Sequence, residues 1–597
     1  MSEYIAPVRD MQFVLQELAG LDQVAQLPGY EEATPDLVDA VLEEAAKFAG
    51  EVLSPLNYSG DQEGATWQDK AVTMPAGFKD AYRLFAESGW PALACETEWG
   101  GQGLPKVVSA AVAEMWKSAN HAFSLCPLLT AGAIEALVLS GSKRLKKTYL
   151  EKMVSGQWTG TMNLTEPNAG SDLAAVRTRA EPQLDGRYKI FGQKIFITYG
   201  DHDLTENIIH LVLARTPDAP EGVKGISLFV VPKFMVNDDG SLGERNDAYC
   251  VSIEHKLGIH ASPTSIMAFG DNGGAIGDLV GEENRGLEYM FIMMNAARFG
   301  VGLEGVAACE RSYQRARDYA CERIQCTDIG VRGGPKVAIT NHPDVRRMLM
   351  TMRAHAEASR ALAYAVAAAL DAAARHPDAD ERKRNQAFAD LMIPVVKGWS
   401  TECGVMVASI GVQVHGGMGY VEETGAAQHL RDAQISTIYE GTTGIQANDL
   451  IGRKMAREGG ATIKALLTSM RALDGELAAQ SGEHFVSLRR RFNAGIDAVE
   501  QAANWLTATY SSDVRAASAG AVPFLKLLGT VAGGWMMVRA ALAAQAQIAS
   551  GNSDPFYATK IVTARFYADH VLSQAEGLAS SVTDGATGVL ALTEEMF

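Results

Sequence analysis

Apolar residues recur at helical spacing along most of the chain, but one central segment follows a different pattern. Residues 37–53 and 107–116 place an apolar side chain every three or four positions, which predicts amphipathic helices. From about residue 159 the period falls to two, and the runs 188–198, 207–213 and 225–231 are rich in β-branched residues and predict strands. The pattern therefore predicts an α+β fold that is mostly α, with its strands gathered in the middle of the chain.

The changes of period predict four domains. A helical N-terminal domain covers residues 1–158, and a central β-domain covers residues 159–282. A helical domain is expected to continue from 283 to 455, and a helical C-terminal extension, 456–597, begins at an Arg-Glu-Gly-Gly break. A chain of 597 residues is also too long for one hydrophobic core, so several domains are expected from length alone.

Composition narrows the class of protein. Apolar residues make up 47% of the chain and charged residues 21%, as in soluble globular proteins. The net charge of −18 repels phosphate backbones, so no nucleic-acid partner is expected. The most apolar late stretch, 519–538, contains Pro523, Lys526 and several glycines, which predicts a buried helix and no membrane span.

Cysteine usage and the N-terminus indicate the compartment. The seven cysteines are odd in number and show no Cys-x-x-Cys spacing, so reduced thiols are expected and no metal site is predicted. The first residues, MSEYIAPVRD, lack both the basic head and the apolar run of a signal peptide. We therefore expect a cytoplasmic protein.

One nominal nucleotide-binding motif lies in the wrong context. Gly300-Val-Gly-Leu-Glu-Gly305 matches the dinucleotide fingerprint, which requires a strand before it and a helix after it. Residues 290–298 instead show a helical pattern that continues through the glycines. We expect a glycine-containing helix here.

The stretch most suggestive of chemistry is 431–446, which reads RDAQISTIYEGTTGIQ. Ile435, Ile438 and Tyr439 precede a single carboxylate, Glu440, and Gly441 follows it. Apolar surroundings disfavour the charged carboxylate and raise its pKa, which suits a general base near neutral pH. Gly441 lets the backbone bend and approach a flat ligand. A solvated glutamate in a turn at the end of a helix is the alternative interpretation of these residues.

Two further stretches place hydrogen-bonding and aromatic groups near the predicted strands. Residues 162–172, MNLTEPNAGSD, form a turn-rich loop whose polar groups suit the edge of a flat ring or a phosphopantetheine arm. Residues 192–198, GQKIFIT, alternate so that Phe196 and Thr198 share one face of a strand. An ordinary turn and an ordinary half-buried strand are the alternatives.

In this order the stretches resemble the acyl-CoA dehydrogenase family. The segments TEPNAGSD, GQKIFIT, AARFGVG, QVHGGMGY and IYEGTTGIQ all occur in family order, and the resemblance covers residues from about 30 to 455. The block 456–597 is similar to the extension of longer members, such as the very-long-chain and methylthiopropanoyl-CoA dehydrogenases. We find no catalytic motif in it.

The resemblance implies a reaction and a base. Glu440 matches the residue that removes the α-proton of an acyl-CoA thioester while the β-hydrogen leaves as hydride to the N5 of FAD, giving the trans-2-enoyl-CoA. The backbone N–H of Glu440 is implied to bind the thioester carbonyl, and Ser171, Arg298 and Gly441 match substrate contacts.

The resemblance also implies an FAD site. Leu164 and Thr165 match positions at the pyrimidine edge of the flavin, Thr198 matches a hydroxyl near N5, and Phe196 stands where many relatives have Trp. The family's segments that hold the FAD of a neighbouring subunit are matched by Arg323, Gln325, Gln413, Gly416 and Gly417. This match implies a homodimer at least. Thr442 matches a further FAD contact.

The most favoured interpretation is an FAD-dependent acyl-CoA dehydrogenase of fatty acid β-oxidation that acts on medium-to-long acyl chains and passes electrons to electron-transferring flavoprotein. A 3-methylthiopropanoyl-CoA dehydrogenase and an acyl-CoA oxidase, which passes electrons to O₂, are alternatives. A DNA-binding relative without dehydrogenase activity and a catalytically silent scaffold remain as well, although the net charge and the retained Glu440 disfavour them.

Overall fold

The computed structural model describes residues 4–597, which form two compact units. The helical unit comprises the described residues up to Ala46 together with Pro105–Ser118 and Arg298–Phe597. The sheet unit comprises Lys47–Leu104 and Ala119–Ala297. Each unit draws on more than one of the four predicted domains, because segments distant in the sequence pack on the same core.

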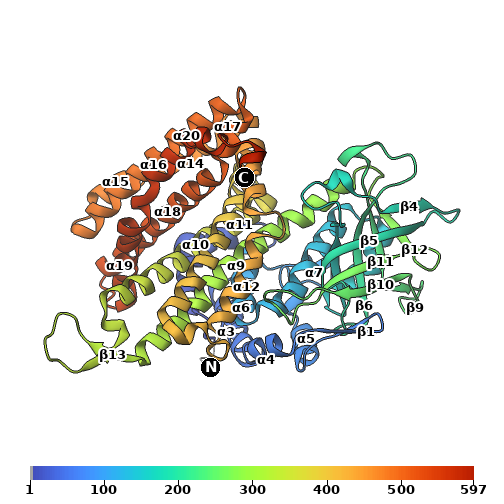
Figure 1. The fold of residues 1–597 in the computed structure, drawn as a ribbon, viewed down its shortest axis with the longest axis horizontal. Helices are drawn as coiled ribbons and strands as arrows, with labels where there is room; N and C mark the ends of the chain where they lie inside the picture. The colour runs from blue at the N-terminus through green and yellow to red at the C-terminus, as the bar shows by residue number, and fades with distance from the viewer. Residues whose placement is uncertain (1–3) are drawn as a thin grey trace. The chain divides into compact units, whose positions relative to one another are not determined.

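Within the described residues of the sheet unit, eight strands form one sheet in the order β10-β11-β5-β12-β7-β6-β3, with β4 paired to β5. The labels β4, β5, β6, β10, β11 and β12 in Figure 1 mark strands of this sheet. Neighbouring strands are antiparallel except β3 and β6, which are parallel. The strands predicted at 188–198, 207–213 and 225–231 are confirmed as β5, β6 and β7. The bounds are β3 Trp158–Asn163, β4 Arg179–Pro182, β5 Tyr188–Thr198, β6 Asn207–Ala214, β7 Ser227–Pro232, β10 Ala248–Ile253, β11 Thr264–Phe269 and β12 Ala275–Val280.

Helix α7 packs closely on strand β3 of the sheet. A Cβ added at Gly160 of β3 would lie 2.5 Å from the Cβ of Ala133 of α7, so glycine is required for this approach. The expectation that residues 1–158 are all helical is wrong at β1 and β2, which pair around Asp69 and Lys70, both at positive φ, as in a tight hairpin turn. The other bounds are α4 Pro55–Glu63, β1 Thr66–Gln68, β2 Ala71–Thr73, α5 Phe78–Glu87, α7 His121–Ser140, α8 Lys143–Val154, β8 Phe234–Val236 and β9 Leu242–Arg245.

Three long helices form the centre of the helical unit. The nominal dinucleotide motif lies inside α9, as predicted, and its glycines allow α9 to pack closely on α11. A Cβ at Gly302 would lie 2.6 Å from Val396 of α11, and a Cβ at Gly305 would lie 2.3 Å from the backbone of Ser400 of α11. The bounds are α1 Val8–Phe13, α2 Leu21–Ala25, α3 Pro35–Phe48, α6 Lys106–Ala119, α9 Gly286–Glu322, α10 Pro343–Arg375, α11 Ala379–His415, α12 Ala426–Gln434 and α13 Thr443–Asn448.

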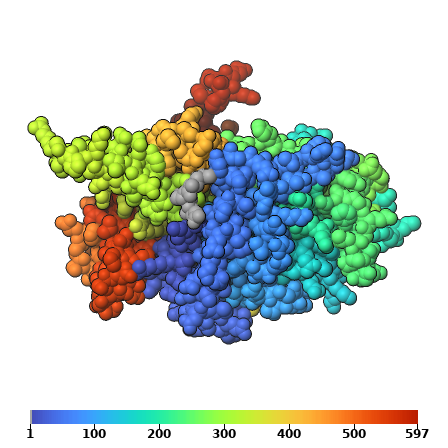
Figure 2. Space-filling model, turned by 90° about the horizontal axis from the view of Figure 1, so that it is seen from below, coloured from blue at the N-terminus to red at the C-terminus, as the bar shows by residue number. Residues whose placement is uncertain are grey.

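A small hairpin interrupts the predicted helical run. Strands β13 (Ile324–Thr327) and β14 (Lys336–Ala338) pair between α9 and α10, so the expectation of helix throughout 283–455 is wrong here. Figure 2 shows this yellow-green part of the chain ending in a tip that stands out from the helices beside it. The sequence carried a signal for it, because a Gly-Gly-Pro turn separates two short runs with β-branched residues.

The C-terminal extension is helical, as predicted, and shares the core of the helical unit. Gly459 and Gly460, at φ of 63° and 75°, form the break before it. Its buried helix α18 packs against α10 and α11 (Figure 1). The bounds are α14 Ala461–Arg471, α15 Asp474–Ala479, α16 Glu483–Tyr510, α17 Val514–Ala519, α18 Ala521–Ala549, α19 Pro555–His570, α20 Ala575–Asp584 and α21 Ala586–Val589.

Two of the described helices, α7 and α18, are long and apolar enough to cross a membrane by length and composition alone. In the folded chain 67% of the apolar window of α7 and 78% of that of α18 are buried. For α18 this burial agrees with the buried helix predicted from the sequence of 519–538.

The contact between α18 and α11 predicts that valine destabilises the protein strongly at one glycine and little at another. A Cβ at Gly529 of α18 would lie 2.2 Å from Cγ of Trp399 of α11, whereas a Cβ at Gly577 of α20 would have no atom within 4 Å. We expect Gly529→Val to lower the free energy of unfolding by about 3 kcal/mol through overpacking. The control Gly577→Val is expected to change it by less than about 0.5 kcal/mol. Denaturant unfolding of both variants measures the difference, and equal stabilities would contradict this packing.

Candidate active site

Glu440 lies in a strained turn of the helical unit, between the short 3-10 helix Ile435–Thr437 and α13. Its φ is 54° and that of Gly441 is 86°, so both residues are left-handed, as the predicted bend at Gly441 requires. A left-handed residue other than glycine costs free energy and is retained where the surrounding structure enforces it, often at functional sites. The Thr442 hydroxyl ends the turn by accepting a hydrogen bond from the Ile445 N–H at 3.2 Å and capping α13.

Two buried side chains hold the backbone of this turn in place. Lys397 Nζ of α11 donates to the Gly441 carbonyl at 2.7 Å. Gln446 Nε2 donates to the carbonyls of Glu440 at 3.1 Å and Gly441 at 3.2 Å. Sequence reasoning missed both residues, although a lysine inside the apolar run MIPVVKGW was a usable signal, because buried lysines are rare unless they are paired.

Charged groups surround the turn within the same unit. Buried Arg298 of α9 lies 3.4 Å from Asp449, and its Nε is buried without a hydrogen-bond partner among the described residues. One turn and a half further along α9, the Glu304 carboxylate accepts a hydrogen bond from the Tyr439 hydroxyl and one from Lys117 Nζ at 3.4 Å. The residue before the candidate base is therefore bound to a buried carboxylate.

These surroundings raise the pKa of Glu440 to about 7, chiefly because burial disfavours its charged form. Glu304 raises this pKa further, while Arg298 and Lys397 oppose the rise. The predicted rise is confirmed. Of the apolar residues before Glu440, Ile438 is 52% exposed, whereas Ile435 and Tyr439 are half-buried. A carboxylate with this pKa is about half ionised at neutral pH and is suited to accept a proton.

In the sheet unit, two of the predicted motifs come together. The Lys194 ammonium of β5 donates to the Leu164 carbonyl at 3.0 Å and to Glu166 at 2.8 Å. The Ile195 N–H donates to the Thr165 carbonyl at 2.9 Å. The loop 162–172 is therefore fixed along the strand that carries Phe196 and Thr198.

Glu166 and Asp172 stabilise that loop. Glu166 also accepts from the backbone N–H groups of Arg177 and Thr178, at 2.7 and 3.0 Å, and Asp172 accepts from the Ala174 N–H at 3.0 Å. These two acids therefore hold the turn together through backbone N–H groups. Ser171, between them in the loop, is exposed.

Phe196 sits at an irregularity of strand β5. The register between β5 and β11 shifts between Ser265 and Met267, and Phe196 has a φ of 59°. The expectation of unbroken alternation through 195–198 is therefore wrong, because a bulge re-aims the side chains. The bulge leaves the Phe196 ring 58% exposed, near the half-buried Thr198. The exposed aromatic ring can stack on one face of a planar ring system, and the nearby hydroxyl and loop groups can bind the polar edge of that system.

The remaining predicted cofactor residues belong to the helical unit and are exposed. Arg323 follows α9 and precedes Gln325 of β13, and the segment 413–417 ends α11. The Tyr319 ring of α9 stacks on the His415 ring of α11 at 4.4 Å, which brings these two segments to the same end of the helix pair. The exposed residues are Arg323, Gln325, Gln413, Gly416, Gly417 and Thr442.

Four family models match successive parts of the chain. They are described as the acyl-CoA dehydrogenase N-terminal domain (residues 37–157), middle domain (161–271) and C-terminal domain (284–455), and as acetyl-CoA dehydrogenase C-terminal like (461–593). The chain belongs to the acyl-CoA dehydrogenase family. It is accordingly an oxidoreductase that acts on CH–CH bonds.

The similarity to individual proteins extends over the whole length. The chain is 50% identical over 593 residues to the 3-methylmercaptopropionyl-CoA dehydrogenase of Ruegeria pomeroyi, covering 98% of this chain and 99% of that protein. It is 35% identical over 593 residues to the broad-specificity linear acyl-CoA dehydrogenase of Mycobacterium tuberculosis, covering 96% of each. Among solved structures, an acyl-CoA dehydrogenase from Bacillus anthracis complexed with FAD matches with a TM-score of 0.73 at 21% identity, covering 97% of this chain and 94% of that one.

The charges around Glu440 predict opposite effects of two substitutions on its pKa. Lys397→Met removes a positive charge that lowers the pKa, so the pH at which substrate-dependent flavin reduction is half-maximal should rise. Glu304→Gln removes a negative charge that raises the pKa, so this pH should fall. With ionised Glu440 as the candidate base, the rate is expected to increase with pH in both variants, and only the midpoint should move. Rapid-mixing measurements of flavin bleaching between pH 5 and 9 give the midpoints.

The control for these variants is Glu423→Gln, an exposed acid in a separate 3-10 helix, which is expected to keep the wild-type midpoint. Shifts of Lys397→Met and Glu304→Gln in the same direction would show that these residues do not act on the base through their charge.

Proposed function

We propose that the protein catalyses the FAD-dependent α,β-dehydrogenation of a short acyl-CoA thioester, with 3-methylmercaptopropionyl-CoA as its preferred substrate. The observation that carries the activity is Glu440, a single carboxylate in a left-handed turn with a pKa of about 7. The choice of substrate is supported by 50% identity over the full length to a dehydrogenase named for that thioester.

Glu440 acts as the base that takes the α-proton. The α-proton of a thioester is only weakly acidic, so the base must be held at a fixed position and kept from full solvation. Lys397 and Gln446 fix the backbone carbonyls of Glu440 and Gly441, and burial tunes the pKa of the Glu440 carboxylate. The buried cation Arg298 stabilises the carboxylate in its ionised form, ready to accept the proton.

The cofactor is FAD, as expected for this family. Bound FAD supplies the acceptor for the β-hydrogen that leaves as hydride. Phe196 would contact a face of the ring system, and the loop at Leu164 and Thr165 with the Thr198 hydroxyl would bind its polar edge. These residues fit such a group because the bulge of β5 exposes an aromatic ring beside a loop fixed by Lys194.

The assembly and the electron acceptor follow from the same proposal. The exposed residues at the end of α9 and α11, including Arg323 and Gln413, would bind the FAD of a neighbouring subunit in a homodimer, while Ser171 contacts CoA. Electrons pass to electron-transferring flavoprotein in the cytoplasm. A dehydrogenase of this kind forms little hydrogen peroxide in air, whereas an acyl-CoA oxidase forms one peroxide per turnover.

A second candidate substrate class is favoured by one relative. The similarity to the broad-specificity linear acyl-CoA dehydrogenase, at 35% identity over 96% of both chains, supports oxidation of medium-to-long linear acyl-CoAs in β-oxidation. The two candidates differ in acyl length and in the thioether sulfur, so a substrate series separates them.

The role of Glu440 is tested by Glu440→Gln. The amide preserves the size of the side chain and the backbone N–H but cannot accept a proton at neutral pH. FAD and acyl-CoA should still bind, while flavin bleaching by substrate should slow by about a hundredfold or more. Glu423→Gln serves as the matched control and should bleach at the wild-type rate. Wild-type bleaching by Glu440→Gln would place the base elsewhere.

The substrate is tested by steady-state rates with 3-methylmercaptopropionyl-, butyryl-, pentanoyl-, octanoyl- and palmitoyl-CoA. We expect kcat/KM to be highest for 3-methylmercaptopropionyl-CoA, and about tenfold higher than for pentanoyl-CoA, which has a methylene in place of the sulfur. A maximum at octanoyl- or palmitoyl-CoA would favour the second candidate. Peroxide yield in the same assays tests the dehydrogenase against the oxidase.

A further inference from the structure

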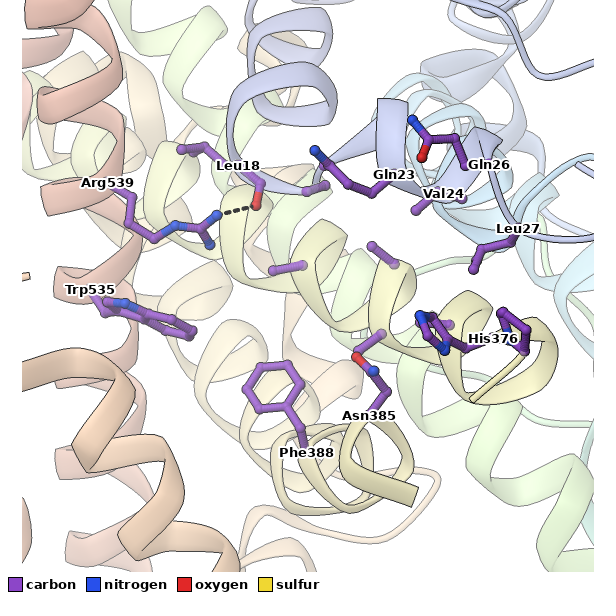
Figure 3. A pocket seen from close by; sticks show the side chains of 17 residues that line it. Leu18, Gln23, Val24, Gln26, Leu27, His376, Asn385, Phe388, Trp535 and Arg539 are labelled. Atoms are coloured by element: carbon purple, nitrogen blue, oxygen red, sulfur yellow. Dashed lines mark hydrogen bonds between the residues drawn. The ribbon is translucent and has the colours of Figure 1, made fainter. Parts of the chain in front are cut away.

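A pocket of about 540 Å³ lies in the helical unit and contains none of the candidate active-site or FAD residues (Figure 3). It opens between the N-terminal segment, the end of α10, the start of α11 and helix α18 of the C-terminal extension. Figure 3 shows Arg539 and Trp535 at one end of the pocket and His376 at the other. Its volume falls in the range of small-molecule sites, about 300–1,000 Å³.

The pocket is positively charged in a strongly acidic protein. Arg539 is its one permanently charged lining residue, and none of the 17 residues that line it is Asp or Glu. Arg539 Nη2 donates to the Leu18 carbonyl at 2.7 Å, and its Nη1 lies 3.7 Å from Met536 Sδ. No carboxylate of the described residues pairs with this guanidinium. A partly buried arginine without an acidic partner is a natural binding group for an anion.

The rest of the lining is apolar and aromatic. The Arg539 guanidinium lies 5.5 Å from the centroid of the Trp535 ring, and Phe388 meets Trp535 edge to face at 6.3 Å. Four alanines at helical spacing on α10 form one wall, and their small side chains leave the space open; they are Ala365, Ala368, Ala369 and Ala372. A ligand that fits this lining carries an apolar body next to its charged group.

We propose that this pocket binds a small organic monocarboxylate with an apolar body, at a site separate from that of the acyl-CoA substrate. The planar guanidinium of Arg539 matches the two oxygens of a carboxylate, and Trp535, Phe388 and the alanines cover an alkyl or aryl chain. A single cation balances a single negative charge, so the polyphosphate of a nucleotide or of CoA is a poor match. Because the pocket joins the N-terminal segment to the extension, a bound ligand also stabilises their contact.

The test measures binding of octanoate to the FAD-loaded enzyme by calorimetry, with 1-octanol as the neutral probe of equal chain length. Arg539→Gln removes the charge, and Ala369→Met fills the space beside the alanine wall. The control, Arg471→Gln, alters an exposed arginine of the extension that is already paired with Asp497 and Glu500. None of these residues belongs to the candidate active site, so substrate-dependent flavin bleaching should stay at the wild-type rate.

We expect Arg539→Gln to weaken octanoate binding by about ten- to a hundredfold and to change 1-octanol binding little, since one charge-assisted contact is lost. Ala369→Met should abolish binding of both probes, and Arg471→Gln should change neither. If Ala369→Met does not fold, Arg539→Lys provides the second variant: it keeps the charge, loses the bidentate geometry and should bind octanoate with intermediate affinity.

Three results would overturn the proposal. The first is no binding of octanoate at millimolar concentration, and the second is octanoate binding that is unchanged in Arg539→Gln. The third is displacement of octanoate by acyl-CoA, because competition would locate it in the substrate site. Failure of the substrate proposal above would leave these binding results unaffected.

Discussion

A fully buried arginine joins the segments that make up the helical unit. Arg360 of α10 binds Asp10 of α1 at 2.6 Å, Glu114 of α6 at 2.5 Å and Glu310 of α9 at 2.8 Å. Lys560 of the extension adds a fifth helix by pairing with Asp10 and with Glu357 of α10. Removing one member of such a network leaves an uncompensated buried charge, at a cost of about 3–5 kcal/mol. Helices from both ends of the chain thus depend on one another.

The same helices carry the groups that tune the candidate base. Glu114 and Lys117 are neighbours on α6, and Glu304 and Glu310 lie under two turns apart on α9. Lys117 pairs with Glu304, which receives the hydrogen bond of Tyr439 next to Glu440. A structural network and a functional one therefore share α6 and α9. A shift of either helix would alter the electrostatic surroundings of the base as well as the packing of the core.

Local pattern determined much of the fold and the identity of the candidate base. The strands at 188–198 and 207–213 were predictable because short runs rich in β-branched and aromatic residues are typical of strands. The helical extension was predictable because a period of 3.6 reports burial on one face. Glu440 was identifiable because a lone carboxylate precedes a glycine within a motif shared by the family. Local breaks in pattern were harder to interpret. The bulge at Phe196 depends on pairing with β11, which lies far along the chain, and the strands β13 and β14 are too short to show a period.

Only the tertiary structure decided which residues surround the base and what the extension contributes. Lys397 and Glu304 lie 43 and 136 residues before Glu440, and Gln446 lies 6 residues after it. No sequence periodicity connects positions at such separations. The pocket at Arg539 combines residues from both ends of the chain in the same way. By itself the sequence determined most of the helices and strands and pointed to the candidate base. Long-range packing decided the pKa of that base, because burial and the charges around it come from segments that meet only after folding.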